Sequence, residues 1–112
     1  MNKKDINKIK ENTEIAEDII FKTADVVNPG VTTYELNRIA KQEFKKHKAL
    51  PSAKFLDLPF WISVAINNEV LFGEISKNKK IEKGDIVKLA LGIFKNGYFS
   101  DLGLTIAVGT VS

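Results

Sequence analysis

The sequence predicts an α+β fold in which two helices pack on one face of an antiparallel sheet. Apolar residues recur at helical spacing in the first part of the chain, whereas the later part holds short apolar runs of strand length. Asn96-Gly97 separates two of these runs and favours a type I′ turn, so residues 86–94 and 98–108 are expected to pair as a hairpin. Helices followed by strands, rather than alternating with them, are typical of α+β domains.

Composition sets the broad class. A chain of 112 residues forms one domain, residues 1–112, with a single core. It contains no cysteine, which excludes disulfides and thiolate metal sites. The polar start and the lack of any run near about 18 apolar residues predict a cytoplasmic protein with no membrane association. The formal charge of +3, from 17 basic and 14 acidic residues, allows contact with RNA but does not establish it.

The first helix is predicted from a stripe of apolar and small residues that recur at steps of three and four. Such a stripe forms one face of an amphipathic helix of about six turns. Asn28-Pro29-Gly30 is expected to end the segment, because proline cannot continue the helical hydrogen bonds. The predicted face consists of Ile6, Ile9, Thr13, Ala16, Ile20, Thr23 and Val27.

The second helix is predicted to begin at a capping box. In this motif the Thr32 side chain accepts a hydrogen bond from the first backbone amides of the helix, and the Glu35 side chain accepts one from the Thr32 N–H. Its apolar stripe is Leu36, Ile39, Ala40 and Phe44, and its lysines are expected to form a solvated face. His47 stands at its end, where interaction with the helix C-terminus is expected rather than catalysis. Because there is no second histidine, we expect no histidine-based metal cluster.

The rest of the chain is predicted as a loop with a short turn over 49–60, short extended pieces at 61–66 and 69–72, and a charged connector over 77–83. Phe60 and Trp61 are expected in the core rather than as a stacking platform for a base. The run 86–94 is nearly all apolar, which predicts that both of its faces are covered somewhere along its length.

One carboxylate, Asp101, stands within the apolar second strand of the predicted hairpin. Aspartate is unfavourable inside a strand, and a buried carboxylate needs a cation, a metal ion or several hydrogen-bond donors. Asp101 is therefore interpreted either as the remains of a site or as a local hydrogen-bonding anchor.

Four segments together resemble the first half of a methionine aminopeptidase of the pita-bread fold, peptidase family M24. Each segment alone is weakly diagnostic, but their order and spacing are specific. The resemblance extends from about residue 6 to residue 112. The segments are Val27-Asn28-Pro29-Gly30-Val31-Thr32-Thr33-Tyr34-Glu35-Leu36, Ala65-Ile66-Asn67-Asn68-Glu69-Val70-Leu71-Phe72-Gly73, Gly84-Asp85-Ile86-Val87, and Asn96-Gly97-Tyr98 ahead of Asp101.

This resemblance implies half of a pita-bread fold and a hydrolase that uses two divalent metal ions, such as Co, Mn, Fe or Zn. The family's second hairpin aspartate corresponds to Asp101, but its first corresponds to Ala90, which cannot bind a metal. The family's catalytic histidine corresponds to Phe72. The remaining ligands, a histidine and two glutamates, belong to a second half that this sequence does not contain.

We therefore expect no cofactor. A single carboxylate competes poorly with the hydration shell of a divalent ion. Asp101 is expected to accept hydrogen bonds from nearby backbone or from Thr105, which lies four residues on and on the same strand face.

The resulting hypothesis is a truncated domain without catalytic activity that serves as a binding module. A half fold leaves an apolar face uncovered, so we expect self-association as a homodimer or a protein partner on that face. One alternative is a split aminopeptidase completed by a second chain, which Ala90 and Phe72 oppose. Another is a ribosome- or RNA-associated relative, supported by charge and by analogy of fold.

Overall fold

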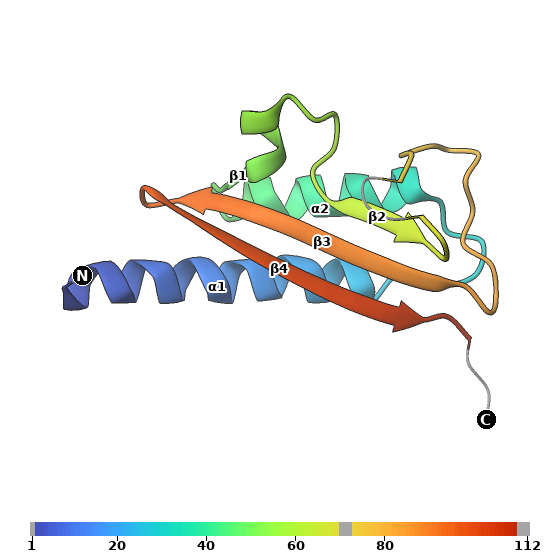
Figure 1. Cartoon of the computed structure of the whole chain (residues 1–112), viewed down its shortest axis with the longest axis horizontal. Coiled ribbons are helices and arrows are strands. Elements are labelled where there is room, and N and C mark those ends of the chain that lie inside the picture. Colours follow the sequence, from blue (N-terminus) through green and yellow to red (C-terminus); the bar gives the residue numbers. More distant parts are fainter. Residues whose placement is uncertain (1, 70–72, 110–112) are drawn as a thin grey trace.

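The computed structural model describes residues 2–69 and 73–109 and confirms two helices with an antiparallel sheet (Figure 1). None of the helices in these ranges is long and apolar enough to cross a membrane. In chain order the elements are α1 (Lys3–Ala24), α2 (Thr33–Lys46), β1 (Leu50–Pro51), the short 3-10 helix η1 (Ser52–Leu56), β2 (Ser63–Ile66), β3 (Ile86–Lys95) and β4 (Tyr98–Ala107).

β3 is the central strand of the sheet. β4 pairs with one side of it over the full length of both strands. β2 and β1 pair with the other side, at the first and last parts of β3 respectively, and every pairing is antiparallel. Asn96 and Gly97 join β3 to β4 with φ angles of 56° and 84°, which confirms the predicted type I′ turn.

The predicted stripe of α1 is confirmed in its second half, where Ala16, Ile20, Thr23 and the following Val27 are buried. Ile6 is 53% exposed and Thr13 is also exposed, so the prediction was wrong at both. The structure also buries residues that the prediction left out, because the face in contact with the sheet is wider than a single stripe. The buried residues of α1 are Asn12, Ile15, Ala16, Ile19, Ile20 and Thr23.

α2 largely follows its prediction. Glu35 N–H donates to Thr32 Oγ1 at 3.1 Å, which is the first half of the expected capping box. Leu36, Ala40 and Phe44 are buried against the sheet. The four lysines that were expected on a solvated face are exposed: Lys41, Lys45, Lys46 and Lys48.

Both helices cover the same face of the sheet. α1 packs on the β3–β4 hairpin and α2 packs on β2 and β1 (Figure 1). The side chains of β3 that point toward the helices are Val87, Leu89, Leu91 and Ile93, and all are buried in one core with the helical residues.

The other face, which we call the open face, is covered only in part. It consists of Ile86, Lys88, Ala90, Gly92 and Phe94 of β3 together with Phe99, Asp101, Gly103, Thr105 and Ala107 of β4. η1 lies over the later part of β3, at Gly92 and Phe94, whereas Ile86 and Lys88 at the start of β3 and every open-face residue of β4 are exposed. The expectation that β3 is covered on both sides therefore holds only where η1 lies.

The predictions between residues 49 and 72 need correction. The segment expected to be a loop with a short turn contains the short helix η1, but it also contains the strand β1, since Leu50 and Pro51 pair with the end of β3. The expected strand 61–66 is shorter, because β2 begins at Ser63. Glu69 lies in no strand, and residues 70–72 of the strand predicted there are outside the described ranges.

Candidate functional site

An open pocket of about 430 Å³ lies between the segment containing η1 and the β3–β4 hairpin. Among the described residues that line it, Asp101 is the one charged side chain, so the pocket is an apolar surface with a single carboxylate. The lining residues are Ser52, Ala53, Leu56, Leu58, Phe60, Trp61, Ser63, Ala90, Leu91, Gly92, Asp101, Leu102 and Gly103.

Ala90 and Asp101 both belong to the open face and both line this pocket. Ala90 pairs with Gly103, and Asp101 pairs with Gly92. The two residues are thus diagonal neighbours on adjacent strands, a relationship that places Cβ atoms within about 7 to 8 Å. The structure therefore brings together the two hairpin positions that the sequence singled out.

The surroundings of Asp101 differ from the prediction. Its side chain is exposed, and among the described residues it makes no hydrogen bond. Thr105 is on the same face, as expected, but four residues along a strand correspond to about 14 Å. Thr105 pairs with Lys88 instead, so it does not support the Asp101 carboxylate.

Gly92 shapes the floor of the pocket beside Asp101. A Cβ atom at Gly92 would lie 2.5 Å from Ser52 Oγ and 2.7 Å from Asp101 Oδ1. Ser52 Oγ is buried and has no hydrogen-bond partner among the described residues. This close approach was not predictable from sequence, because it depends on where η1 lies over β3. Phe72, the other position that the sequence singled out, is outside the described residues.

A second polar cluster joins α1 to α2. His47 Nε2 lies 2.7 Å from Asp18 Oδ2, and Lys22 Nζ lies 3.2 Å from the same oxygen and 3.3 Å from Glu43 Oε1. The hydrogen bond from His47, followed by the contact with Lys22, holds the pKa of Asp18 below its usual value.

This cluster corrects the expectation for His47. Asp18, Glu43 and His47 offer ligand-type atoms that all lie within 4.8 Å of one another, so one histidine takes part in a group of metal-ligand type. Lys22 stands against both carboxylates, and the arrangement serves as an ion-pair network between the helices. Sequence reasoning missed it because Asp18 and His47, which join the two helices, lie 29 residues apart in the chain.

The sequence profile of metallopeptidase family M24 matches residues 7–112. The chain belongs to metallopeptidase family M24. A methionine aminopeptidase of Clostridium acetobutylicum is 38% identical to this M24 chain over 114 residues, covering 93% of the chain and 46% of that enzyme. One from Aquifex aeolicus is 33% identical over 113 residues, covering 95% of the chain and 44% of that enzyme.

Solved structures show the same fold. The methionine aminopeptidase from Thermotoga maritima matches 100% of the M24 chain and 45% of its own chain, with a TM-score of 0.91 and 26% identity. The prolidase from Pyrococcus furiosus matches 99% of the M24 chain and 32% of its own, with a TM-score of 0.79 and 26% identity. The pita-bread half fold predicted from the sequence is confirmed. The chain spans a little under half the length of the methionine aminopeptidases it matches.

The described residues of the pocket do not fit a centre of two metal ions. Metal ions in such a centre are bridged and held by several carboxylates. Here Asp101 is exposed, and the diagonal position beside it carries the methyl group of Ala90. Neither Ser52 nor Ser63, the remaining polar residues of the lining, carries a carboxylate or an imidazole.

Proposed function

We propose that this chain is a catalytically inactive domain of the methionine aminopeptidase type, which works in the cytoplasm as an interaction module and associates with itself. The proposal joins two features of the molecule. One is a pocket with too few ligands for catalysis, and the other is an open face that the helices do not cover.

The observation that carries the first part is the pair Ala90 and Asp101. They occupy the diagonal positions where the family resemblance places two metal-binding aspartates. A methyl group at Ala90 offers no ligand, and the resemblance also places phenylalanine, Phe72, where the family has its catalytic histidine. A water molecule needs a strongly polarising ion or a nearby base to become a nucleophile at neutral pH.

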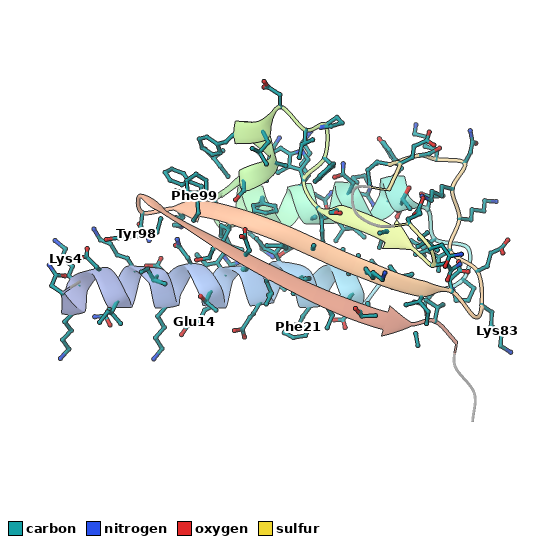
Figure 2. The ribbon with its side chains drawn as sticks, viewed as in Figure 1. Lys4, Glu14, Phe21, Lys83, Tyr98 and Phe99 are labelled. Atoms are coloured by element: carbon teal, nitrogen blue, oxygen red, sulfur yellow. The ribbon has the colours of Figure 1, made fainter. Side chains whose placement is uncertain are left out.

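The second part is supported by exposed apolar side chains on the open face. Phe99 is 57% exposed and Ile86 is 38% exposed. Phe55, Phe94 and Phe99 form an aromatic cluster at one end of this face, with ring centroids 4.6 to 5.4 Å apart. Figure 2 shows Phe99 at the hairpin end of β4, on the side away from α1. Apolar surface of this kind marks association sites.

Catalysis is tested by incubating the purified chain with a Met-Ala-Ser peptide and cobalt or manganese. We expect no release of methionine. Metal-dependent release that scales with the amount of chain and stops with a chelator would refute the inactive assignment. Release only after a second protein is added would favour the split-enzyme alternative.

Self-association is tested by analytical ultracentrifugation at tens of micromolar. We expect a dimer that dissociates on dilution. A monomer at every concentration would refute the self-association. RNA binding that weakens steeply with salt in such a monomer would favour the RNA-associated alternative instead.

A further inference from the structure

The outer edge of β4 carries a row of unpaired backbone groups. Lys95 and Tyr98 close a two-residue hairpin, so their backbones hydrogen-bond to each other. From Tyr98 onward, every second residue of β4 therefore directs its backbone N–H and C=O groups toward β3. The intervening residues direct their N–H and C=O groups outward. β4 pairs with β3 alone, so these groups have no strand partner within residues 2–69 and 73–109. The outward-facing residues are Phe99, Asp101, Gly103, Thr105 and Ala107.

This edge lacks the usual protection against pairing. Exposed edge strands are commonly kept short or interrupted by proline, lysine or a bulge. β4 has ten residues in unbroken register with β3, contains no proline or lysine, and carries one charge, at Asp101.

We propose that β4 pairs antiparallel with β4 of a second copy of this chain, about a two-fold axis at Gly103. The inference rests on the self-association proposed above and assigns it to the edge of the sheet at β4, so that the open faces of the two copies lie side by side rather than against each other. Gly103 then faces the partner's Gly103, and the two sheets become continuous. In this register Asp101 lies opposite the partner's Thr105, and Phe99 lies opposite the partner's Ala107.

Charge complementarity selects this register. Lys88 is exposed on the open face, pairs with Thr105 of its own chain and has no ion-pair partner in the described structure. With the axis at Gly103, the residues Lys88, Thr105 and the partner's Asp101 lie side by side on three successive strands. The two Cα atoms are then two strand spacings apart, about 10 Å, which a lysine side chain and a carboxylate can bridge over the small Thr105. Symmetry gives two such pairs.

Apolar complementarity supports the same arrangement. Ile86 pairs with Ala107, and Phe94 pairs with Phe99. In the proposed register four residues lie side by side on successive strands: Ile86, Ala107, the partner's Phe99 and the partner's Phe94. The exposed Ile86 and Phe99 side chains therefore lie in one row on either side of the interface.

Neighbouring registers lose these matches. An axis at Asp101 would place this carboxylate directly opposite the partner's Asp101, and like charges directly opposite each other are destabilising. An axis at Thr105 would carry Phe99 beyond the end of the paired strands. In the proposed register the two residues that face each other at the axis are both Gly103, which has no side chain, and the next residue in each copy is the small Ala90.

The register can be tested by cross-linking because the chain contains no cysteine. In a hydrogen-bonded antiparallel pair the Cα atoms are about 5.5 Å apart, within the range that a disulfide spans. A Cβ atom at Gly103 would have its nearest contact at 3.7 Å, to Leu89 O, so Gly103→Cys fits the fold. Under mild oxidation, Gly103→Cys should become a disulfide-linked dimer.

Phe99→Cys and Ala107→Cys are the matched controls. Each residue lies four positions from the axis, so its two copies would be about 27 Å apart and neither variant alone should cross-link. Mixing the two variants should give a cross-linked heterodimer, because Phe99 faces the partner's Ala107.

Charge reversal gives a readout that does not depend on a new thiol. Asp101→Lys should raise the dimer dissociation constant at least tenfold, and Lys88→Asp combined with Asp101→Lys should restore most of the affinity. A dimer in which Gly103→Cys remains reduced would overturn this pairing and leave the proposed self-association standing. A monomer by ultracentrifugation, with Gly103→Cys also reduced, would overturn both.

Discussion

Ala90 and Asp101 are diagonal neighbours on the open face of the sheet, and both line the same pocket. Their arrangement is set by the hairpin register, which the Asn96-Gly97 turn fixes. Asp101 is the charged member of the pair, and the geometry that would bring a second carboxylate beside it is still present. The pocket therefore lacks a carboxylate at position 90, although the backbone that would hold such a carboxylate beside Asp101 is present.

The first prediction concerns the response to metal ions. Manganese at 1 mM should scarcely stabilise the unmodified chain, because a ligand with a Kd near 1 mM adds about 0.4 kcal/mol. Ala90→Asp places a second carboxylate diagonal to Asp101. With a Kd of about 0.1 mM, the same manganese concentration adds about 1.4 kcal/mol, which a thermal melt detects as a rise of several degrees.

Asp101→Ala in the Ala90→Asp background is the control, and it should abolish this response. A large rise in the unmodified chain would contradict the prediction. Loss of that rise in Asp18→Asn, rather than in Asp101→Ala, would place the ion at the cluster of Asp18, Glu43 and His47.

The second prediction concerns Asn12, which is fully buried in α1. Its Nδ2 donates to the carbonyl oxygens of Lys95 at 2.8 Å and Tyr98 at 3.1 Å, so it joins α1 to the hairpin turn. Asn12→Ala leaves those carbonyls without this donor and should lower the free energy of unfolding by about 2 kcal/mol. Urea denaturation measures the loss. Thr13→Ala, at the exposed neighbour, should change it by no more than about 0.5 kcal/mol.

The hairpin and the second helix were predictable from sequence because local chemistry determines them. Asn96 and Gly97 accept positive φ angles, and Thr32 caps the helix that follows it. The burial of Asn12 was not predictable in the same way. Burying an asparagine side chain costs free energy unless its amide is hydrogen-bonded. The carbonyl groups that accept from Asn12 belong to residues more than 80 positions away in the chain.

The site shows the same division. The sequence placed Ala90 and Asp101 together because a hairpin register follows from its turn. It did not predict that Asp101 is exposed, since this depends on η1 covering β3 and leaving β4 uncovered. The support expected from Thr105 failed on strand geometry, because a shared face does not bring residues four positions apart into contact.

The third prediction concerns pH and Asp85, which precedes β3. Asp85 Oδ2 accepts from Glu82 N–H at 2.8 Å, and Asp85 Oδ1 accepts from Asn67 Nδ2 at 2.9 Å. The bond from the Glu82 backbone, then that from Asn67, lowers the pKa of Asp85. Because the pKa of Asp85 is lower in the folded state, the ionised carboxylate stabilises the fold at pH values above its unfolded-state pKa of about 3.9. This stabilisation is lost as the pH falls through the folded-state pKa.

Asp85→Asn should therefore be less stable than the unmodified chain at pH 6, and the difference should shrink below about pH 4. Thermal melts between pH 2.5 and 6 measure it. Asp57→Asn is the control, because the Asp57 side chain is exposed and makes no hydrogen bond to the described residues. A difference that stays constant down to pH 2.5 would show that the Asp85 carboxylate does not hold this turn.

The fourth prediction concerns Gly92 and the position of η1. A methyl group there would lie 2.5 Å from Ser52 Oγ and 2.7 Å from Ser52 Cβ, so the 3-10 helix would have to move. Gly92→Ala should lower the free energy of unfolding by about 2 kcal/mol, the usual cost of overpacking. Urea denaturation at matched protein concentration measures it, with Gly103→Ala as a control that has its nearest contact at 3.7 Å.

Ser52→Gly should recover much of the stability that Gly92→Ala loses, because it removes both short contacts with Ser52. The third contact, 2.7 Å to Asp101 Oδ1, involves an exposed carboxylate that can rotate away into solvent. If Ser52→Gly restores the stability, the clash caused by Gly92→Ala is with Ser52 of η1 rather than with Asp101 of β4. If Gly92→Ala were as stable as Gly103→Ala, η1 would not be seated on β3, and the pocket between them would have a different floor.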